Sequence, residues 1–330
     1  MSNATPFGFR IVGACTGDRK LIDWPKAFAA YCSANAKAGV SNEGYLSAFT
    51  FGCDFRDHLQ RTGSTRAYKG SCGALWCWWD IDRADDLVLA LNDARTLCVQ
   101  LGERFTVSDD SLLVFFSGSK GFHVGLPLWG FGPKPGPMFH RIARRFAEQV
   151  AEQAGIVIDT GVYDCVRAFR APNSRHPKTG LHKRRLTVDE LLYTGVDRIV
   201  ELACEPEPFE LAELGDGKCG FELPAAWNAA TEQVQNESKA MLKRRDAVVK
   251  GDVSAKLNSL TLHFLREGAT TGDRHRLLFS ASANLAECGA PLHLCHGLLS
   301  EPARDSGLPP SEVERQIRCG YEHGIKGGIA

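Results

Sequence analysis

Long apolar runs are missing from this 330-residue chain. No stretch of roughly eighteen consecutive apolar residues occurs, which excludes an ordinary membrane-spanning helix. The first ten residues also lack the basic start and the apolar stretch of a secretory signal peptide. We therefore expect a cytoplasmic protein that has no membrane association.

A net charge is missing as well, because 39 Lys and Arg residues balance 39 Asp and Glu residues. Any surface that binds nucleic acid must then be a local concentration of basic side chains. The twelve cysteines have no regular spacing, and without a signal peptide this favours reduced thiols over a disulfide framework. The 44% of apolar residues is ample for one large catalytic domain and a smaller one.

The middle of the chain has the apolar pattern of alternating strands and helices. Residues 74–82 are too short and too aromatic for a surface helix and predict a buried strand. Asp85 and Asp86 can cap the helix that follows. The other elements expected are helices over 22–38 and 138–154 and strands over 112–116, 122–128 and 156–159. The central order of strand, helix, two strands, helix and strand suits a split βαβ sheet of the ferredoxin or RRM-like type.

The two ends of the chain differ from this middle block. About the first 65 residues have the pattern of mixed helix and loop, whereas residues 204–235 mix acidic residues, Pro and Gly as a linker does. Helices dominate from Asp273 onward. We therefore expect an α+β fold in which a large domain, 1–203, and a small all-α domain, 251–330, are joined by a linker region, 204–250.

Two carboxylates end the buried strand. Asp80 and Asp82 lie two positions apart, so both side chains leave the same face of the strand, while Trp79 and Ile81 pack the other. Paired carboxylates repel each other unless a cation lies between them, and Mg²⁺ and Mn²⁺ prefer oxygen ligands. The plain alternative is a strand end that carries two solvated acids.

A glycine-rich turn lies between the next two strands. Ser117 to Gly121 combines backbone amides that can approach a phosphate with the ammonium of Lys120, and His123 starts the strand that follows. This turn is not a Walker A loop, whose GxxxxGK[ST] spacing and following helix are absent. An ordinary hairpin turn with a surface lysine is the alternative.

A third polar segment begins with a carboxylate and continues with many basic groups. Asp159 comes first, and the basic residues are Arg167, Arg170, Arg175, His176, Lys178, Lys183, Arg184 and Arg185. An acid beside such groups fits a third metal ligand next to a triphosphate, because guanidinium groups pair well with phosphate oxygens. A solvated basic loop has the same composition.

Together these segments resemble the archaeo-eukaryotic primase superfamily. The three matching motifs are residues 79–82 (WDID), 117–124 (SGSKGFHV) and 158–170 (IDTGVYDCVRAFR), and the third is most similar to the PrimPol branch. The stretch 174–181 (SRHPKTGL) also resembles archaeal small-subunit primases. Order and spacing match over roughly residues 70–190.

The resemblance implies a DNA primase-polymerase of phage or plasmid type, with an RRM-like catalytic sheet and an α/β N-terminal layer. Asp80, Asp82 and Asp159 would hold two Mg²⁺ or Mn²⁺ ions. The residues expected to contact the incoming NTP or dNTP are Ser117, Ser119, Lys120, His123, Arg167, Arg170, His176 and Lys178. Some members have a serine at the position of Gly121, so Ser117, Ser119 or a backbone amide would make that contact here.

A template strand and its primer need further positive charge. The candidates are Arg141, Arg144, Arg145, Lys183, Arg184 and Arg185. Trp129 or Phe131 could stack on a base or only pack their own loop. The segment 267–289 resembles the helical domain that follows phage and plasmid primase cores, and without a Walker A loop a helicase is expected in trans.

Other interpretations remain open. A zinc site at Cys53, His58, Cys72 and Cys77, or at His293, Cys295 and His296, would lack the usual CxxC spacing, so buried thiols are the default. A replication-initiation or origin-binding protein with a regulatory nucleotide site is the second hypothesis for function. A repair polymerase is the third, and the primase-type helices at the C-terminus argue against it.

Overall fold

The computed structural model describes residues 6–83, 86–211, 220–249, 257–270 and 272–326. They fall into two compact units, Met1–Val234 and Gln235–Ala330. The first unit is a mixture of helices and two antiparallel sheets, as the α+β prediction requires. Within the described ranges, no helix combines the length and the apolarity that crossing a membrane requires.

The first sheet is built mainly from the N-terminal residues. Its strands follow the order β5-β4-β1-β3-β9, and β2 pairs with β1. Their bounds are β1 Phe7–Val12, β2 Lys20–Asp23, β3 Gly44–Ser47, β4 Thr50–Phe51, β5 Cys72–Gly73 and β9 Ala168–Arg170. The expectation of helix and loop over about the first 65 residues therefore missed these strands, although helices do form over 24–32 and 53–62, and the two together agree with the expected α/β N-terminal layer. These strands are short and pair with distant partners, so each carries little local pattern.

The helix expected over 22–38 is shorter than predicted. Asp23 ends β2 and then caps α1 (Trp24–Cys32) by accepting a hydrogen bond from the Lys26 backbone N–H at 3.2 Å. Pro25 fits in the first turn of this helix because the N–H that proline lacks would have no hydrogen-bond partner within the helix there. A separate 3₁₀ turn, η1 (Ala36–Ala38), follows.

The second sheet contains the strands predicted in the middle of the chain. Its order is β10-β7-β8-β6, with β6 at Trp76–Asp82, β7 at Leu113–Phe116, β8 at Gly121–Pro127 and β10 at Arg184–Leu186. Because β8 pairs antiparallel with both β6 and β7, those two strands run parallel to each other. The chain between them is α3 (Leu87–Phe105), so these elements form a split βαβ unit.

The strand expected at 156–159 does not form. Instead, the side chain of Asp159 caps a 3₁₀ turn, η3 (Thr160–Tyr163), and a single backbone hydrogen bond joins this segment to β6. The fourth strand of the sheet is β10, which pairs with β7 at the opposite edge. The segment 156–159 is extended and has the apolar pattern of a strand. It ends at once in the cap of η3, however, and so forms no ladder of hydrogen bonds with a neighbouring strand.

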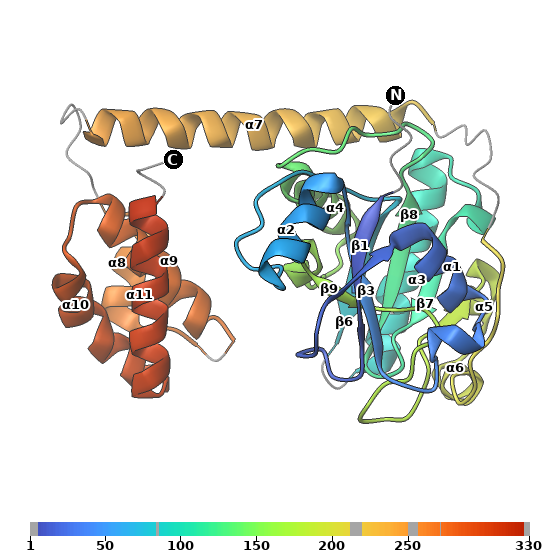
Figure 1. The fold of residues 1–330 in the computed structure, drawn as a ribbon. Helices are drawn as coiled ribbons and strands as arrows, with labels where there is room; N and C mark the ends of the chain where they lie inside the picture. The colour runs from blue at the N-terminus through green and yellow to red at the C-terminus, as the bar shows by residue number, and fades with distance from the viewer. Residues whose placement is uncertain (1–5, 84–85, 212–219, 250–256, 271, 327–330) are drawn as a thin grey trace. The chain divides into compact units, whose positions relative to one another are not determined.

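Helices α3 and α4 (Phe139–Ala154) cover one face of the second sheet (Figure 1). Trp79 is fully buried beneath α4 and donates its indole N–H to the Ala147 carbonyl at 3.1 Å. Asp86 caps α3 through the Leu89 backbone N–H at 2.8 Å, as predicted, whereas Asp85 lies outside the described residues. The other helices of this unit are α2 (Cys53–Thr62), η2 (Asp109–Ser111), α5 (Val188–Tyr193) and α6 (Val196–Leu202).

Part of the expected linker region, 204–250, is a 28-residue helix, α7 (Glu222–Val249). Its apolar residues Leu223, Trp227 and Ala230 are buried in the core of the first unit. Residues 212–219 and 250 lie outside the described residues. The predicted domain limits at 203 and 251 stay predictions.

Every element described in the second unit is a helix, as the sequence predicts. Its further helices are α8 (Ser259–Glu267), α9 (Arg274–Glu287), α10 (Leu292–Asp305) and α11 (Pro310–Lys326). They enclose a separate apolar core around Phe264, Leu278, Leu299 and Ile317, each of which has no exposed surface.

Candidate active site

Asp80 and Asp82 lie on the same face of β6, opposite the helices. Trp79 and Ile81 alternate with them and have no exposed surface, whereas the side chains of the two aspartates retain 16% and 26% of theirs. The alternation of a strand therefore places both carboxylates on one side of the sheet, as their spacing predicts.

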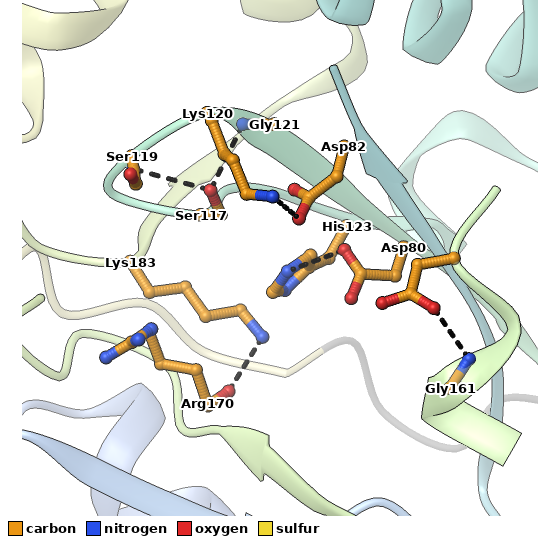
Figure 2. Close-up of polar contacts among 11 residues, drawn as sticks. Asp80, Asp82, Ser117, Ser119, Lys120, Gly121, His123, Gly161, Arg170 and Lys183 are labelled. Carbon is orange, nitrogen blue, oxygen red and sulfur yellow. Dashed lines mark hydrogen bonds and ion pairs between the residues drawn. The ribbon is translucent and has the colours of Figure 1, made fainter. Parts of the chain in front are cut away.

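His123 faces this acidic pair from the neighbouring strand. In the antiparallel register of β6 and β8 it lies directly opposite Asp80, and its Nε2 is 3.3 Å from Asp80 Oδ1 (Figure 2). The side chain of His123 is buried, and Phe122 and Val124 on either side of it point to the opposite, fully buried face. The strand pairing thus holds an imidazole against one of the two carboxylates.

The turn before His123 brings a cation and several backbone amides to the same place. The Ser117 hydroxyl oxygen accepts hydrogen bonds from the N–H groups of Ser119 at 3.4 Å and Gly121 at 3.3 Å. Lys120 Nζ lies 2.9 Å from Asp82 Oδ2 (Figure 2). Ser117 therefore shapes the turn from within, whereas Lys120 extends from it to the acids.

Asp159 reaches the site from the other side of β6. Its backbone N–H donates to the carbonyl of Asp80 at 2.8 Å, and its Oδ1 accepts from the N–H of Gly161 at 2.8 Å. Tyr163, a residue that the sequence analysis did not single out, fixes the following turn by donating its hydroxyl to the Trp78 carbonyl. The signal for it was its place in the third motif, beside Asp159.

The three carboxylates share one region without forming a tight group. Among the described residues, groups of three or more possible ligands with all ligand atoms within 4.8 Å do not include these aspartates. Lys120 nevertheless lies in the field of all three: Asp82, through contact and charge, raises the pKa of this lysine most, and Asp80 and Asp159 raise it further. The ammonium of Lys120 therefore lies where the negative charges of all three carboxylates act together.

Burial and charge act against each other on Asp80 and His123. Burial favours the neutral acid, but His123, Lys183 and Arg167 outweigh it and hold the pKa of Asp80 below its usual range. Burial and the charge of Lys183 hold the pKa of His123 below its usual range despite Asp80. Asp80 is therefore ionised at neutral pH, whereas burial opposes a charge on the neighbouring imidazole.

The donor set fits Mg²⁺ or Mn²⁺. Asp80 Oδ1 is buried, and although the imidazole of His123 is near it, no hydrogen-bond donor is aligned with it. A buried carboxylate oxygen without a donor is costly unless a cation takes that role. The nearby acids Asp82 and Asp159 provide more oxygen ligands of the kind that these ions prefer.

Lys183 and Arg184 do not lie where the sequence predicted. The side chain of Lys183 is fully buried, its Nζ donates to the Arg170 carbonyl at 2.8 Å, and it lies 4.2 Å from the centre of the Phe169 ring. Arg184 is also buried and is paired with Glu207. Both placements contradict a role at a nucleic-acid surface, because neither side chain reaches that surface.

Other basic groups of this segment lie beside β9 and in the loop of His176, which contacts the glycine-rich turn. Arg167 is exposed just before β9, and the guanidinium of Arg170 lies 5.1 Å from the centre of the Tyr45 ring. His176 accepts hydrogen bonds on Nδ1 from the N–H groups of Lys178 and Thr179, each at 3.3 Å. The Thr179 hydroxyl donates to the Gly118 carbonyl at 2.6 Å and so ties this loop to the turn.

The protonation of His176 follows from these contacts. Partial burial, Arg170 and Lys178 hold its pKa below the usual value, which favours the neutral ring at neutral pH. Because Nδ1 accepts hydrogen bonds, the ring proton lies on Nε2. His176 therefore offers an N–H donor, the group that a phosphate or sugar oxygen requires.

The basic face of α4 is partly neutralised. Arg141 and Arg144 are exposed and Arg145 is half-buried. Arg144 Nε lies 2.7 Å from Glu148 Oε1, and Arg145 lies 3.9 Å from the same carboxylate. Arg185, on β10, lies 5.1 Å from the ring centre of Phe209. Contact of these four arginines with DNA stays a prediction.

The Pro/Gly loop favours packing over base stacking. Trp129 makes an edge contact with Trp76 at a centroid distance of 5.3 Å, and Phe131 lies 5.6 Å from Trp227. Both partner rings belong to the buried core. Each of these two aromatic side chains therefore packs against the core of the protein.

Neither zinc cluster suggested by the sequence forms among the described residues. Cys77 is buried with its thiol near the Ala143 carbonyl, and Cys295 lies in the core of the second unit. Cys72 instead gathers with His140 and Cys165, residues that the sequence did not link to it. Proximity along the chain was a poor guide here, since the three residues come from separate elements.

Comparison with known proteins gives only weak likenesses. No family model and no curated protein matches the chain. A crystal structure of primase RepB' is 14% identical, with a TM-score of 0.35 over 99% of this chain and 93% of that one. A polymerase domain from Mycobacterium tuberculosis Ligase D in complex with DNA is 17% identical, with a TM-score of 0.36 over 58% and 69% of the two chains. Scores this low establish neither the family nor the activity of this chain.

Proposed function

We propose that this chain is a DNA primase-polymerase that joins nucleotides on a single-stranded DNA template and extends the primer that results. Asp80, Asp82 and Asp159 would hold Mg²⁺ or Mn²⁺, and NTP or dNTP is the substrate. The proposal rests on the three motifs of the sequence together with the arrangement of these acids.

The observation that carries the proposal is the hydrogen bond from the Asp159 N–H to the Asp80 carbonyl, 2.8 Å long. It brings the third motif against the strand of the first motif, although the two are far apart in the chain. The third acid is thereby next to the first, and Lys120 lies in the field of both and of Asp82. A strand end with solvated acids would need none of these contacts.

When bound between these acids, divalent ions would lower the pKa of the attacking 3′-hydroxyl and stabilise the charge of the departing pyrophosphate. The protein's own task is to align the groups. Asp80 is fixed by strand pairing and by His123, whereas Asp159 is fixed by its cap on Gly161. Such alignment supplies a large part of the rate in nucleotidyl transfer.

The triphosphate would lie between the glycine-rich turn and the loop of His176. The turn offers backbone N–H groups and the ammonium of Lys120, and the loop offers the Nε2–H of His176. Arg167, exposed beside the third motif, adds a guanidinium that pairs well with phosphate oxygens. Lys183, buried beneath Asp80, offsets the acidic charge from within the protein.

The second candidate function, replication initiation with a regulatory nucleotide site, would bind nucleotide at the same place without turnover. Asp80 and Asp82 favour catalysis, since nucleotide binding alone gains little from two carboxylates that repel the phosphates. The proposal also includes a role in primer synthesis, a helicase that acts in trans, and a phage or plasmid replicon.

The test is synthesis on single-stranded DNA with labelled NTPs or dNTPs, with and without a primer, in Mg²⁺ and then in Mn²⁺. The wild-type chain should make and extend primers, and Asp82→Asn should lose about a thousandfold in rate. Asp197→Asn, an exposed aspartate of α6, is the matched control. Nucleotide binding without any synthesis by the wild type would favour the initiation protein instead.

A further inference from the structure

Cys72, His140 and Cys165 form a cluster outside the acidic site. Their ligand atoms all lie within 4.8 Å of one another, and Cys72 Sγ is 3.9 Å from His140 Nδ1. Cys72 is in β5, His140 is in the first turn of α4, and Cys165 lies between η3 and β9. Three separate elements therefore bring two thiols and an imidazole to one point.

The backbone around this point is held firmly. Cys72 exchanges two backbone hydrogen bonds with Gly136, at 3.2 and 2.9 Å, which fixes β5 against the start of α4. Cys165 follows Tyr163, whose buried hydroxyl is bonded to β6. The side chain of Cys72 is buried, whereas His140 and Cys165 are half-buried, so an ion from solvent can reach the cluster.

We propose that Cys72, Cys165 and His140 bind one Zn²⁺ ion through two thiolates and an imidazole nitrogen. Tetrahedral zinc places sulfur ligands about 3.8 Å apart and sulfur and nitrogen ligands about 3.5 Å apart, given its bond lengths of about 2.3 and 2.0 Å. The 3.9 Å between Cys72 Sγ and His140 Nδ1 is close to the second value, and the other ligand atoms lie within 4.8 Å, a distance that small side-chain movements can shorten. Two thiolates neutralise the ion, which favours its burial, and a water molecule takes the fourth position.

The zinc ion would fasten the third motif to the core of the first unit. Cys165 stands between Asp159, the proposed third acid, and Arg167, the proposed phosphate contact, while Cys72 and His140 belong to β5 and α4. The ion thus adds a cross-link to a segment that forms no strand ladder at 156–159. Its role is positional, and it takes no part in the reaction at the aspartates.

The first test is the zinc content of the full-length reduced protein after dialysis, measured by mass spectrometry. We expect about one equivalent in the wild type and its loss in Cys165→Ser and in His140→Asn. Cys204→Ser, at an exposed thiol, is the matched control and should retain the ion. Asp82→Asn should also retain it, which separates this site from the proposed catalytic one.

Two further measurements do not depend on a variant that folds. Zinc should protect Cys72 and Cys165 of the wild type from alkylation, while Cys204 reacts at the same rate with and without the ion. Replacement by Co²⁺ should give the charge-transfer absorption of a thiolate-bound ion. Absence of metal from the reduced protein, an equivalent that survives in Cys165→Ser, or a Cys72–Cys165 disulfide in the protein as isolated would overturn the proposal.

Discussion

Asp80 and His123 lie opposite each other on neighbouring antiparallel strands, and His123 Nε2 is 3.3 Å from Asp80 Oδ1. Burial and Lys183 hold the pKa of His123 below its usual value, whereas the neighbouring carboxylates of Asp80 and Asp82 raise it. The ring limits where the Asp80 carboxylate can turn, which the proposed cation site requires. The residues around this pair can be tested separately.

His123→Asn should mainly weaken nucleotide use. The shorter amide removes the ring that faces Asp80 and the proposed triphosphate, so we expect KM for nucleotide to rise about tenfold, the cost of one hydrogen bond to a charged group. Steady-state primer extension at several nucleotide concentrations measures this. An unchanged KM and kcat would remove His123 from the site.

Lys120→Met should increase the affinity for Mn²⁺. The ammonium pairs with Asp82 at 2.9 Å and is attracted by Asp80 and Asp159, so it competes with a metal ion for the same charge. Because the pair is exposed to solvent, we expect a gain of only a fewfold. Titration with Mn²⁺ followed by electron paramagnetic resonance is the measurement, and Lys120→Arg, which keeps the charge, is the control. Weaker Mn²⁺ binding in Lys120→Met would contradict the competition.

Lys183→Met should stabilise the fold. Burial holds the pKa of Lys183 well below its usual value, so the native state binds this proton less tightly than the unfolded state does. The resulting penalty is complete below the lowered pKa and is relieved as the pH rises from that value toward the unfolded value. At neutral pH, the variant should gain about 1 kcal/mol in free energy of unfolding.

The pH dependence of Lys183→Met supplies its control. Urea denaturation of both proteins between neutral and alkaline pH should show the stability of the wild type approaching that of the variant as the pH rises. A constant difference between the two proteins across this range would mean that Lys183 binds its proton equally in the folded and unfolded states, so that folding does not lower its pKa.

Gly121→Ser should destabilise the protein by about 1 to 3 kcal/mol. A Cβ at this position would lie 2.1 Å from the Ile81 carbonyl oxygen and 2.5 Å from Asp82 Oδ1, so the two strands would have to separate. Ser119→Ala, in the same turn but half-exposed, is the matched control and should change stability little. Chemical denaturation of the wild type and the two variants measures this difference. Equal midpoints for the wild type and Gly121→Ser would show that the two strands accommodate the added side chain at little cost in stability.

The central strands and helices could be predicted from the sequence because they carry strong local signals. Asp80 and Asp82 share a face through the two-residue period of a strand, and Gly155 ends α4 in the left-handed conformation. The N-terminal strands could not be predicted, since pairs such as Phe7 with Phe51 join residues far apart in the chain. The local sequence pattern of a short strand carries little information about such distant pairing.

The parts of the site differ in the same way. The motifs indicated which residues would gather, but not that Lys183 would be buried against Phe169, because a basic stretch has the same composition in a core as on a surface. The meeting of Cys72 with Cys165 was equally hidden, since it depends on how β5 and η3 fold back onto α4. Tertiary contacts decide both outcomes.

The first turns of α7 have a practical consequence for anyone who prepares a shorter recombinant fragment. Trp227 lies 5.3 Å from the ring of Phe139 and 5.5 Å from that of Phe146, both on α4. Truncation at residue 203, where the sequence alone would end the catalytic domain, uncovers these rings to water and invites aggregation. A fragment that continues to residue 234 keeps them covered, so the boundary chosen for expression decides whether the first unit can be assayed for the proposed activity on its own.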